Sequence, residues 1–371
     1  EVQALESEWC ATFGAQHAIS VNSATSGLYA ALGAAQIGPG DEVIVPPYTM
    51  SATAMAPLVY GAIPVFADIE EDTFCLDPVQ VRRMIGVKTR AILAVNLFGH
   101  PARLHELRAL ADEKGLLLIE DNAQAPLATE FDRYAGTVGH IGVFSLNRHK
   151  HIQTGEGGIC TTDDADLALR LRLIRNHGEN LVDHYEFEDI ANLVGFNYRL
   201  TEISAAIGRA QLAKAETIME EREGFARRLS AAVSGLPGIT PPVVREGCRH
   251  VYYAWPARYD PETVGVSREV FVKALAAEGV AFDPGYVEPL YLLPVFQRRV
   301  AIGRDGFPFN QTNRQYNKGL CPVAERMHFE EEIGFGICSY ELSDELIDAI
   351  ANAVHKVYEG RAELRKLEPA A

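Results

Sequence analysis

Short apolar segments alternate with helical segments along the first 235 residues, and this alternation constrains the fold more than any other feature of the chain. The apolar segments are rich in Val and Ile and lack polar alternation, as expected for strands buried on both faces of a parallel sheet. Strands are predicted at residues 18–21, 43–45, 63–66, 91–95, 116–119 and 141–144, and helices at 25–36, 51–60, 78–85 and 104–114. Repeated units of this kind predict an α/β fold with a mostly parallel sheet flanked by helices.

A break in the helical pattern near residue 236 divides the chain. Residues 201–234 are strongly helical, and the sequence LPGITPP at 236–242 ends that pattern, because proline and glycine disrupt helices. We therefore predict a large α/β domain at 1–235 and a smaller C-terminal α+β domain at 236–371. In the second domain a strand is expected at 252–259, and helices are expected at 268–278 and 344–359.

The composition limits the classes of function. The formal net charge of -16 argues against a nucleic acid partner, because a large negative field repels phosphate backbones. No apolar run approaches the roughly 20 residues that a membrane-spanning helix needs. The six cysteines are scattered without a C-x-x-C pair, which predicts reduced thiols in a cytoplasmic protein rather than disulfides or a metal site.

The segment FSLNRHKHIQTGEGG, residues 144–158, carries the most chemical information. Ser145 ends an apolar run, and Lys150 follows five residues later, ahead of a glycine-rich turn. A lone lysine is most often a solvated surface charge, but this one lies between a predicted strand and another apparent strand at 158–161. His149 and His151 flank it without a nearby carboxylate cluster, so no metal site is predicted there.

Two further segments indicate what this lysine does. Asp121 follows the apolar run at 116–119, at the strand end where parallel sheets bind ligands. Ala24, Thr25 and Ser26 follow the first predicted strand and open a helix, whose free N–H groups can bind a phosphate. Taken singly, these residues could be helix caps or surface groups. Together with Ser145 and Lys150, they supply what pyridoxal 5'-phosphate (PLP) requires: a Schiff-base lysine, a phosphate site and a carboxylate for a ring nitrogen.

Several segments in one order resemble a single family over nearly the whole chain. They are the small-residue turn at 23–26, GDEVIVPPYT (40–49), GAIPVFADI (61–69), EDNAQA (120–125), FSLNRHK with GEGG, RNHG (175–178), GFNYRL (195–200), AAIGRAQL (205–212) and PVAER (322–326). The chain resembles the PLP-dependent sugar aminotransferases of the DegT/StrS type, within fold type I of the PLP enzymes. An ordered set of this kind is far more specific than any single motif.

The resemblance implies a role for each candidate site residue. Lys150 is expected to hold the cofactor and to carry protons, and Asp121 is expected to face the pyridine nitrogen. Gln124 would contact the other polar edge of the ring. The phosphate would be bound by Ala24, Thr25, Ser26 and Ser145 of one subunit and by Asn197 of its neighbour. The implied assembly is a homodimer with shared active sites.

Some positions depart from the usual pattern of the family. Met50 stands where an aromatic residue commonly stacks on the cofactor ring, so its polarizable sulfur and the nearby Tyr48 are the two candidates for that role. Family members often carry histidine at positions on or near the substrate side of the pocket, which here are Asn96, Pro126, Tyr286 and Tyr291. The substrate is therefore less constrained than the chemistry.

The resemblance implies transfer of an amino group from glutamate to a keto-sugar, which is expected to be nucleotide-linked. The chain has Lys150 where a dehydratase branch of the family has histidine, and this favours transamination. An amino-cyclitol transaminase, a sugar dehydratase on the same fold and a non-catalytic PLP-binding protein remain as alternatives. A sugar diphosphate would need positive charge, which the stretch from Arg148 to His177 is expected to supply. It holds Arg148, Lys150, Arg170, Arg172 and Arg175, with His149, His151 and His177 beside them. The alternative is that Arg170, Arg172 and Arg175 form the solvated face of one helix.

Overall fold

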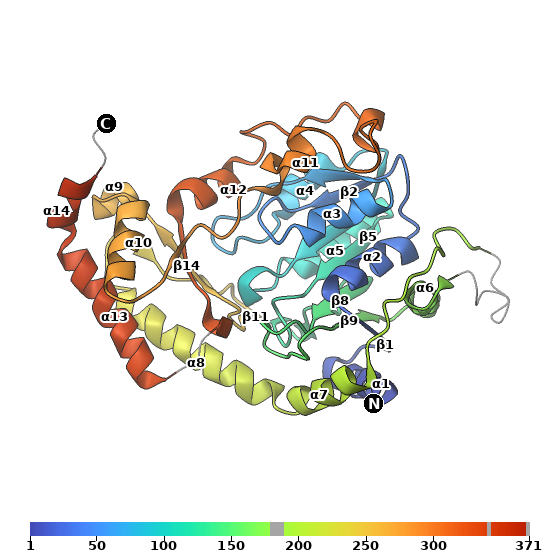
Figure 1. Cartoon of the computed structure of the whole chain (residues 1–371), viewed down its shortest axis with the longest axis horizontal. Coiled ribbons are helices and arrows are strands. Elements are labelled where there is room, and N and C mark those ends of the chain that lie inside the picture. The colour runs from blue at the N-terminus through green and yellow to red at the C-terminus, as the bar shows by residue number, and fades with distance from the viewer. Residues whose placement is uncertain (179–188, 340–342, 369–371) are drawn as a thin grey trace.

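A seven-stranded sheet forms the centre of the molecule in the computed structural model, which describes residues 1–178, 189–339 and 343–368 (Figure 1). The strands lie in the order β1-β9-β8-β5-β4-β2-β3. Their bounds are β1 (His17–Val21), β2 (Glu42–Val45), β3 (Ile63–Phe66), β4 (Thr89–Val95), β5 (Leu117–Asp121), β8 (Ile141–Ser145) and β9 (Gly158–Thr162). The strand β9 runs in the opposite direction to the other six, so the predicted fold class, α/β with a mostly parallel sheet, is confirmed.

Helices flank this sheet because parallel strands need crossover connections, which are usually helical. They are α1 (Val2–Phe13), α2 (Ala24–Ala34), α3 (Ala52–Val59), α4 (Pro78–Met84), α5 (Leu104–Lys114), α6 (Ala165–Arg175) and α7 (Glu202–Leu212). The helix α2 packs against α3 and α6 and contacts β8 and β9. Ser23 caps it, since the Ser23 side chain accepts a hydrogen bond from the Ser26 amide at 3.1 Å. The cap fixes the start of α2 at the carboxyl end of β1.

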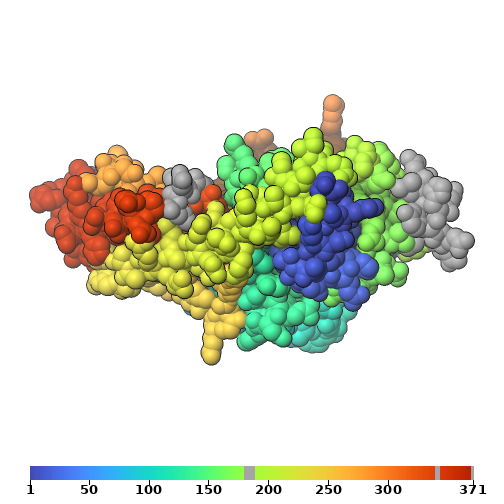
Figure 2. Space-filling model, turned by 90° about the horizontal axis from the view of Figure 1, so that it is seen from below, coloured from blue at the N-terminus to red at the C-terminus, as the bar shows by residue number. Residues whose placement is uncertain are grey.

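Several later segments of the chain build a second unit beside the central sheet, at the left of Figure 1. Its four-stranded antiparallel sheet has the order β10-β12-β14-β13. Its elements are β10 (Ile239–Thr240), β12 (Trp255–Tyr259), β13 (Asp283–Pro284), β14 (Glu332–Phe335), α8 (Ala215–Val233), α9 (Pro261–Val264), α10 (Arg268–Ala277), α13 (Asp344–Glu359) and α14 (Arg361–Leu364). Figure 2 shows α7 and α8, yellow-green to yellow, running along one face from the N-terminal helix toward this unit.

A small three-stranded sheet also joins distant parts of the chain. In it β11 (Cys248–Arg249) pairs antiparallel with β6 (Thr129–Glu130), which pairs in turn with β7 (Arg133–Tyr134). The segment before β12 therefore hydrogen bonds to a loop that follows β5. This connection holds the start of the second unit against the edge of the central sheet.

Two buried clusters of hydrophobic side chains form the interior of the described chain. The first surrounds the central sheet and also takes in Leu290, Phe309 and Met327. The second lies between the second sheet and its helices, and Trp255 and Phe271 are among its members. The stretch from 290 to 327, with α11 (Pro294–Gln297) and α12 (Pro322–Arg326), thus packs on the central unit. The domain boundary at residue 235 stays a prediction.

The predicted elements differ from the structure mainly at their ends. The helices α5 and α13 begin and end where they were predicted. The strand β5 continues past its predicted end at 119 and takes in Asp121 as its last residue. The strand predicted from residue 252 begins only at Trp255, because the preceding residues hydrogen bond to the loop after β4, with Val251 N donating to Gly99 O at 3.0 Å. The helix α1 was not predicted.

Three further expectations from the sequence concern membrane spans, disulfides and metal sites. None of the helices in those ranges is both long and apolar enough to cross a lipid bilayer. All six cysteines are free thiols. No group of three or more His, Cys, Asp or Glu side chains in these ranges is arranged to hold a metal ion.

Candidate active site

A hollow of about 370 Å³, the sheet-edge pocket, opens at the carboxyl edge of the central sheet. Its walls follow the ends of strands: residues 23–25 follow β1, 49–52 follow β2, 121–124 end or follow β5, and 145–150 end or follow β8. This edge is where parallel α/β sheets bind ligands. Seven predicted residues line the pocket: Ala24, Thr25, Met50, Asp121, Gln124, Ser145 and Lys150. The lining of this described chain does not include Ser26 and Asn197.

One end of the sheet-edge pocket is the first turn of α2. The first amide groups of an α-helix have no acceptor within their own helix and carry partial positive charge, so they suit a phosphate. Ala24 and Thr25 lie at this point and line the pocket. Ser26 is engaged in the cap, because its amide donates to Ser23 Oγ at 3.1 Å and its hydroxyl to Asn22 Oδ1 at 2.6 Å. The Ser26 side chain therefore holds the turn in shape.

Gly158 brings the other phosphate candidate, Ser145, next to this turn. In β9 it pairs with Ser145 on one side and with Val21 on the other. A Cβ atom at residue 158 would lie 2.7 Å from the carbonyl carbon of Ser23 and 2.8 Å from the amide nitrogen of Ala24. Only glycine leaves room for this close approach of two backbones. Sterics therefore require glycine at residue 158, the last residue of the glycine-rich turn after Lys150.

Asp121 is buried in the floor of the pocket. Its Oδ2 accepts a hydrogen bond from Thr53 Oγ1 at 2.9 Å, and its Oδ1 accepts one from the Ala123 amide at 3.2 Å. Burial raises the pKa of Asp121, while these two bonds and the charge of Lys150 act in the opposite direction. A cationic ring nitrogen placed against the carboxylate would add to these lowering effects on the pKa of Asp121 and keep the carboxylate ionised.

The neighbouring acid, Glu120, has a structural role. Successive side chains of a strand point to opposite faces, so Glu120 faces away from the side on which Asp121 lies. Its carboxylate accepts hydrogen bonds from backbone amides of residues 136, 138 and 139 at 2.6, 2.8 and 2.6 Å, and from Asn96 Nδ2 at 3.1 Å. With these donors Glu120 anchors the loop at 136–139. Of the two adjacent acids on β5, Glu120 therefore stabilises the loop, and Asp121 lines the pocket.

Lys150 lies on the wall that follows β8. Its Nζ lies 4.1 Å from the centroid of the Tyr253 ring, which is a cation–π contact. Burial lowers the pKa of Lys150 to about 8, although the charge of Asp121 acts in the opposite direction. A useful fraction of the amine is therefore unprotonated near neutral pH, as a nucleophile or proton carrier must be.

Met50, rather than Tyr48, faces the pocket. The Met50 side chain lines the pocket and is 60% exposed, as a residue at a pocket mouth would be. Tyr48 is fully buried, donates to Glu332 Oε2 at 3.3 Å and accepts a hydrogen bond from the Tyr286 amide at 2.7 Å. Tyr48 therefore supports the wall from behind, and Met50 is left as the candidate cover for the ring.

The positions at which family members often carry histidine lie in different places. Tyr286 lines the pocket. The other three are buried away from it: Asn96, Pro126 and Tyr291. The expectation that such positions reach the substrate side therefore applies to Tyr286.

Asn197 lies on the surface near the phosphate turn. Its side chain is exposed, and its carbonyl oxygen accepts a hydrogen bond from Asn22 Nδ2 at 3.4 Å. This position is outside the pocket of its own chain and accessible to a second copy. Its role at a partner's phosphate stays a prediction.

The expected arginine cluster does not face the pocket. Arg170 is buried in α6 and donates to the carbonyl oxygens of Asp189 and Ala191, both at 2.8 Å. Arg175 forms an ion pair with Glu6 at 2.7 Å. The helix face is thus packed rather than solvated at these positions. Among the described residues that line the pocket, the basic ones are Lys150 and His149.

The two histidines beside Lys150 point to different places. His149 is exposed and lines the pocket. His151 is buried, with its Nε2 2.9 Å from the carbonyl oxygen of Val251. Burial lowers the pKa of His151 to about 3, so its ring is neutral at neutral pH.

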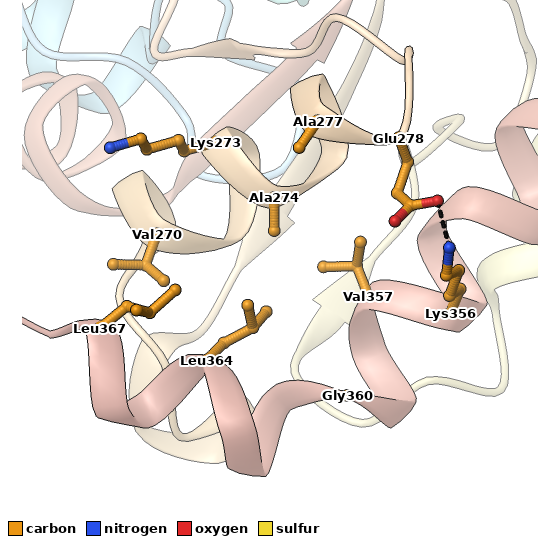
Figure 3. A pocket seen from close by; sticks show the side chains of 10 residues that line it. All are labelled: Val270, Lys273, Ala274, Ala277, Glu278, Lys356, Val357, Gly360, Leu364 and Leu367. Carbon is orange, nitrogen blue, oxygen red and sulfur yellow. Dashed lines mark hydrogen bonds and ion pairs between the residues drawn. The ribbon is translucent and has the colours of Figure 1, made fainter.

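A second hollow, the outer groove, lies in the second unit between α10, α13 and the turns that follow α13 (Figure 3). Its volume is about 520 Å³. Apolar side chains form most of its walls, and they include Val270, Val357 and Leu364. Of its charged residues, Lys356 and Glu278 are paired with each other at 2.6 Å. Its charged groups thus lie among apolar helix side chains, whereas the sheet-edge pocket is lined by polar residues from several strand ends.

The profile of the DegT/DnrJ/EryC1/StrS aminotransferase family matches residues 1–332 of the chain. The chain belongs to this family. The spore coat polysaccharide biosynthesis protein SpsC of Bacillus subtilis (strain 168) is 32% identical to it, over 97% of this chain and 90% of SpsC. GDP-perosamine synthase of Caulobacter vibrioides is 37% identical over 76% of this chain and 75% of its own length. The structure of DesI in the presence of its TDP-sugar product matches with a TM-score of 0.82 and 28% identity, over 99% of this chain and 86% of DesI.

This DegT/DnrJ/EryC1/StrS family member is a PLP-dependent aminotransferase of fold type I. The pocket fits that cofactor. The start of α2 and Ser145 suit its phosphate, Asp121 suits its ring nitrogen, and Lys150 suits its aldehyde. These partners come from three strand ends, those of β1, β5 and β8, and Gly158 lets the ends of β1 and β8 approach each other.

The sequence did not reveal two further members of the aminotransferase site, Thr53 and Tyr253. Thr53 lies in the apolar helix α3, and its partner Asp121 is 68 residues away. Tyr253 falls within the strand predicted at 252–259, so its approach to Lys150 had no local signal. Both depend on how separate segments pack.

Proposed function

We propose that this aminotransferase transfers an amino group from glutamate to a nucleotide-linked keto-sugar. The observation that carries the proposal is the convergence of Lys150, Asp121 and the first turn of α2 in one pocket. PLP, when bound, supplies an aldehyde that exchanges amino groups and a ring that withdraws electrons. The residues of the chain position that group and move protons.

Lys150 is proposed as the residue that holds the cofactor and transfers protons. Its Nζ takes the proton from the amino-bearing carbon of the donor and returns it on the cofactor side. Because the pKa of Lys150 is lowered to about 8 by burial, the amine can both accept and release a proton near neutral pH. Asp121 keeps a proton on the ring nitrogen, and Thr53 and Ala123 hold its carboxylate in place.

The relatives support a nucleotide-linked sugar as the amino acceptor. One is named GDP-perosamine synthase, another is named for spore coat polysaccharide biosynthesis, and DesI was solved in the presence of a TDP-sugar product. Within this chain, Lys150 and His149 are the basic residues among the described pocket lining. Further charge for a diphosphate is proposed to come from the exposed Arg148, whose Nε lies 3.1 Å from His149 Nε2, and from the second subunit of the proposed dimer.

The substrate is tested in the reverse direction. GDP-, TDP- and UDP-linked amino sugars and free amino-cyclitols are offered separately, with 2-oxoglutarate as the amino acceptor. Turnover with a nucleotide-linked sugar and formation of glutamate are expected. Turnover only with free cyclitols would reject the nucleotide-sugar proposal but keep the transaminase. Replacing 2-oxoglutarate by pyruvate tests the choice of glutamate as donor.

The active form is proposed to be a cytoplasmic homodimer in which Asn197 reaches the phosphate of the partner. Exposed apolar side chains support an interface next to it, since Val194, Ile203 and Ile207 are 72%, 77% and 43% exposed. Ile203 and Ile207 lie one turn apart on α7. The six free cysteines suit a reducing compartment.

Sedimentation at assay concentration tests the dimer, and PLP titration tests the contact. Asn197→Ala is expected to weaken PLP binding about tenfold, because a hydrogen bond to a charged phosphate is lost. Asn317→Ala, at another exposed asparagine, is the control and should bind PLP normally. An active monomer would reject the dimer, and unchanged affinity in Asn197→Ala would reject the contact.

A further inference from the structure

One wall of the sheet-edge pocket is a chain of hydrogen bonds whose direction can be assigned. The Phe98 amide donates to the side chain of Gln124 at 2.7 Å. A backbone N–H can only donate, so the Gln124 atom that faces it must be the amide oxygen. The Gln124 nitrogen, Nε2, therefore faces the hydroxyl of Tyr286, which lies 3.0 Å away.

This assignment determines what the Tyr286 hydroxyl can do. An amide nitrogen also can only donate, so the Tyr286 oxygen accepts from Gln124, and its own O–H must point elsewhere. Within the described residues no acceptor lies in hydrogen-bond reach of that O–H, and Tyr286 lines the pocket. Burial raises the pKa of Tyr286, so the hydroxyl stays protonated at neutral pH. The Tyr286 O–H is therefore available as a hydrogen-bond donor in the pocket.

The donor is held in place before any ligand binds. The Tyr286 amide donates to the hydroxyl of Tyr48 at 2.7 Å, and the Tyr48 hydroxyl donates to Glu332 Oε2 at 3.3 Å. The ring of Phe98 packs edge-on against the Tyr286 ring, with centroids 5.0 Å apart. Tyr48 and Glu332 are buried. A donor fixed in this way loses little freedom when it binds an acceptor.

Gln124 offers a second donor beside it. Its Nε2 carries two hydrogens, and only one is used by Tyr286. The remaining N–H and the Tyr286 O–H start from atoms 3.0 Å apart on one wall. Gln124 follows Asp121 by three residues, so this pair lies near the proposed place of the ring nitrogen. Of the polar atoms of PLP, the phosphate is assigned to the start of α2, the ring nitrogen to Asp121 and the aldehyde to Lys150. The ring oxygen is left for this wall.

We infer that Tyr286 is a cofactor-contacting residue whose hydroxyl donates a hydrogen bond to the ring oxygen of PLP, next to Gln124, and that Phe98 and Gln124 fix this direction. The inference rests on the proposed roles of Asp121 and Lys150 in the same pocket. Two donors stabilise the deprotonated form of an oxygen better than one, so Tyr286 would tune the titration of the bound cofactor.

The test uses the holoenzyme, PLP and no sugar, so that a wrong substrate in the proposed function cannot affect it. Tyr286→Phe is expected to raise the Kd for PLP about tenfold and to raise the pH midpoint of the bound cofactor's absorbance by about one unit. Tyr60→Phe is the control, because the buried Tyr60 hydroxyl has no hydrogen-bond partner within the described chain and does not line the pocket. It should leave the Kd and the midpoint within about twofold and about 0.2 units of wild type.

A second variant tests the direction of the bonds. In Gln124→Glu, the carboxylate can still accept from the Phe98 amide, but it would also accept the Tyr286 proton and turn it away from the pocket. Adding Tyr286→Phe to Gln124→Glu should then change the midpoint less than Tyr286→Phe does in the wild type. The inference is overturned if Tyr286→Phe behaves like the control, or if the two shifts simply add. Failure of the proposed function would show separately, as borohydride labelling of a lysine other than Lys150.

Discussion

The sheet-edge pocket and the outer groove are both hollows, but they are built in different ways. The groove is larger, at about 520 Å³ against about 370 Å³. Its walls are helix side chains that pack apolar surfaces together and leave charged groups at the rim. The pocket walls are strand ends, which bring polar residues far apart in the sequence to one edge of the sheet. In this protein the candidate chemistry therefore lies where strand ends converge, and not in the larger hollow.

The largest difference between the two hollows is expected when a lysine is removed from each. Lys150→Ala is expected to lower turnover at least about a thousandfold, because both the covalent hold on PLP and the proton carrier are lost. Lys273→Ala, at an exposed lysine of the groove, should leave turnover within about twofold. Steady-state rates measure both effects, and circular dichroism confirms that each variant folds. Borohydride labelling of PLP on another lysine would contradict the assignment of Lys150.

An acid in each hollow gives the next comparison. Asp121→Asn is expected to lower kcat by about a hundredfold or more, because the ring nitrogen loses its carboxylate partner. Glu278→Gln removes an acid of the groove that pairs with Lys356 at the surface, so kcat should stay within about twofold. A kcat near the wild-type value in Asp121→Asn would remove Asp121 from its proposed role.

Cofactor capture in the sheet-edge pocket should depend on pH. The unprotonated Lys150 amine reacts, so the rate constant for PLP capture by the cofactor-free protein should rise with pH through about 8 and level off above it. Burial lowers the pKa of Lys150, and the charge of Asp121 partly opposes this. Asp121→Asn should therefore move the midpoint to lower pH. Stopped-flow absorbance over a pH series measures it, and a flat profile would count against Lys150 as the capturing group.

The smallest effect on activity is expected in the wall of the groove. Val357 is 6% exposed, and Val357→Ala should lower the free energy of unfolding by about 2 kcal/mol through lost burial and a small cavity. Because Val357 lies in the second unit, kcat and PLP affinity should stay unchanged. Urea unfolding and a PLP titration measure the two properties. A tenfold loss of kcat would show that the groove is coupled to the chemistry.

Much of the fold could be predicted because its signals are local. Buried parallel strands appear as apolar runs, and α5 and α13 carry helical patterns with clear ends. The helix α1 was missed although Leu5, Trp9 and Phe13 are buried at a spacing of four residues, because no side-chain cap marks its start. The packing of residues 290–327 on the central unit likewise depends on contacts that no local pattern encodes.

The residues of the candidate site likewise fall into those with a local sequence signal and those that depend on packing. Lys150, Ser145 and Asp121 could be found because each stands at a strand end or beside a motif. Tyr253 could not, because it reaches Lys150 only through the packing of another segment. The expectation for Arg170 failed since a run of basic residues on a helix does not reveal which side chains the rest of the fold will bury.

The hydrogen bonds to Glu120 have a consequence for how the enzyme is supplied with its cofactor. They join β5 to the loop at 136–139 by protein groups alone, so the floor beneath Asp121 does not need PLP to hold its shape. We therefore expect the chain to fold when vitamin B6 is scarce and to remain as a stable reserve.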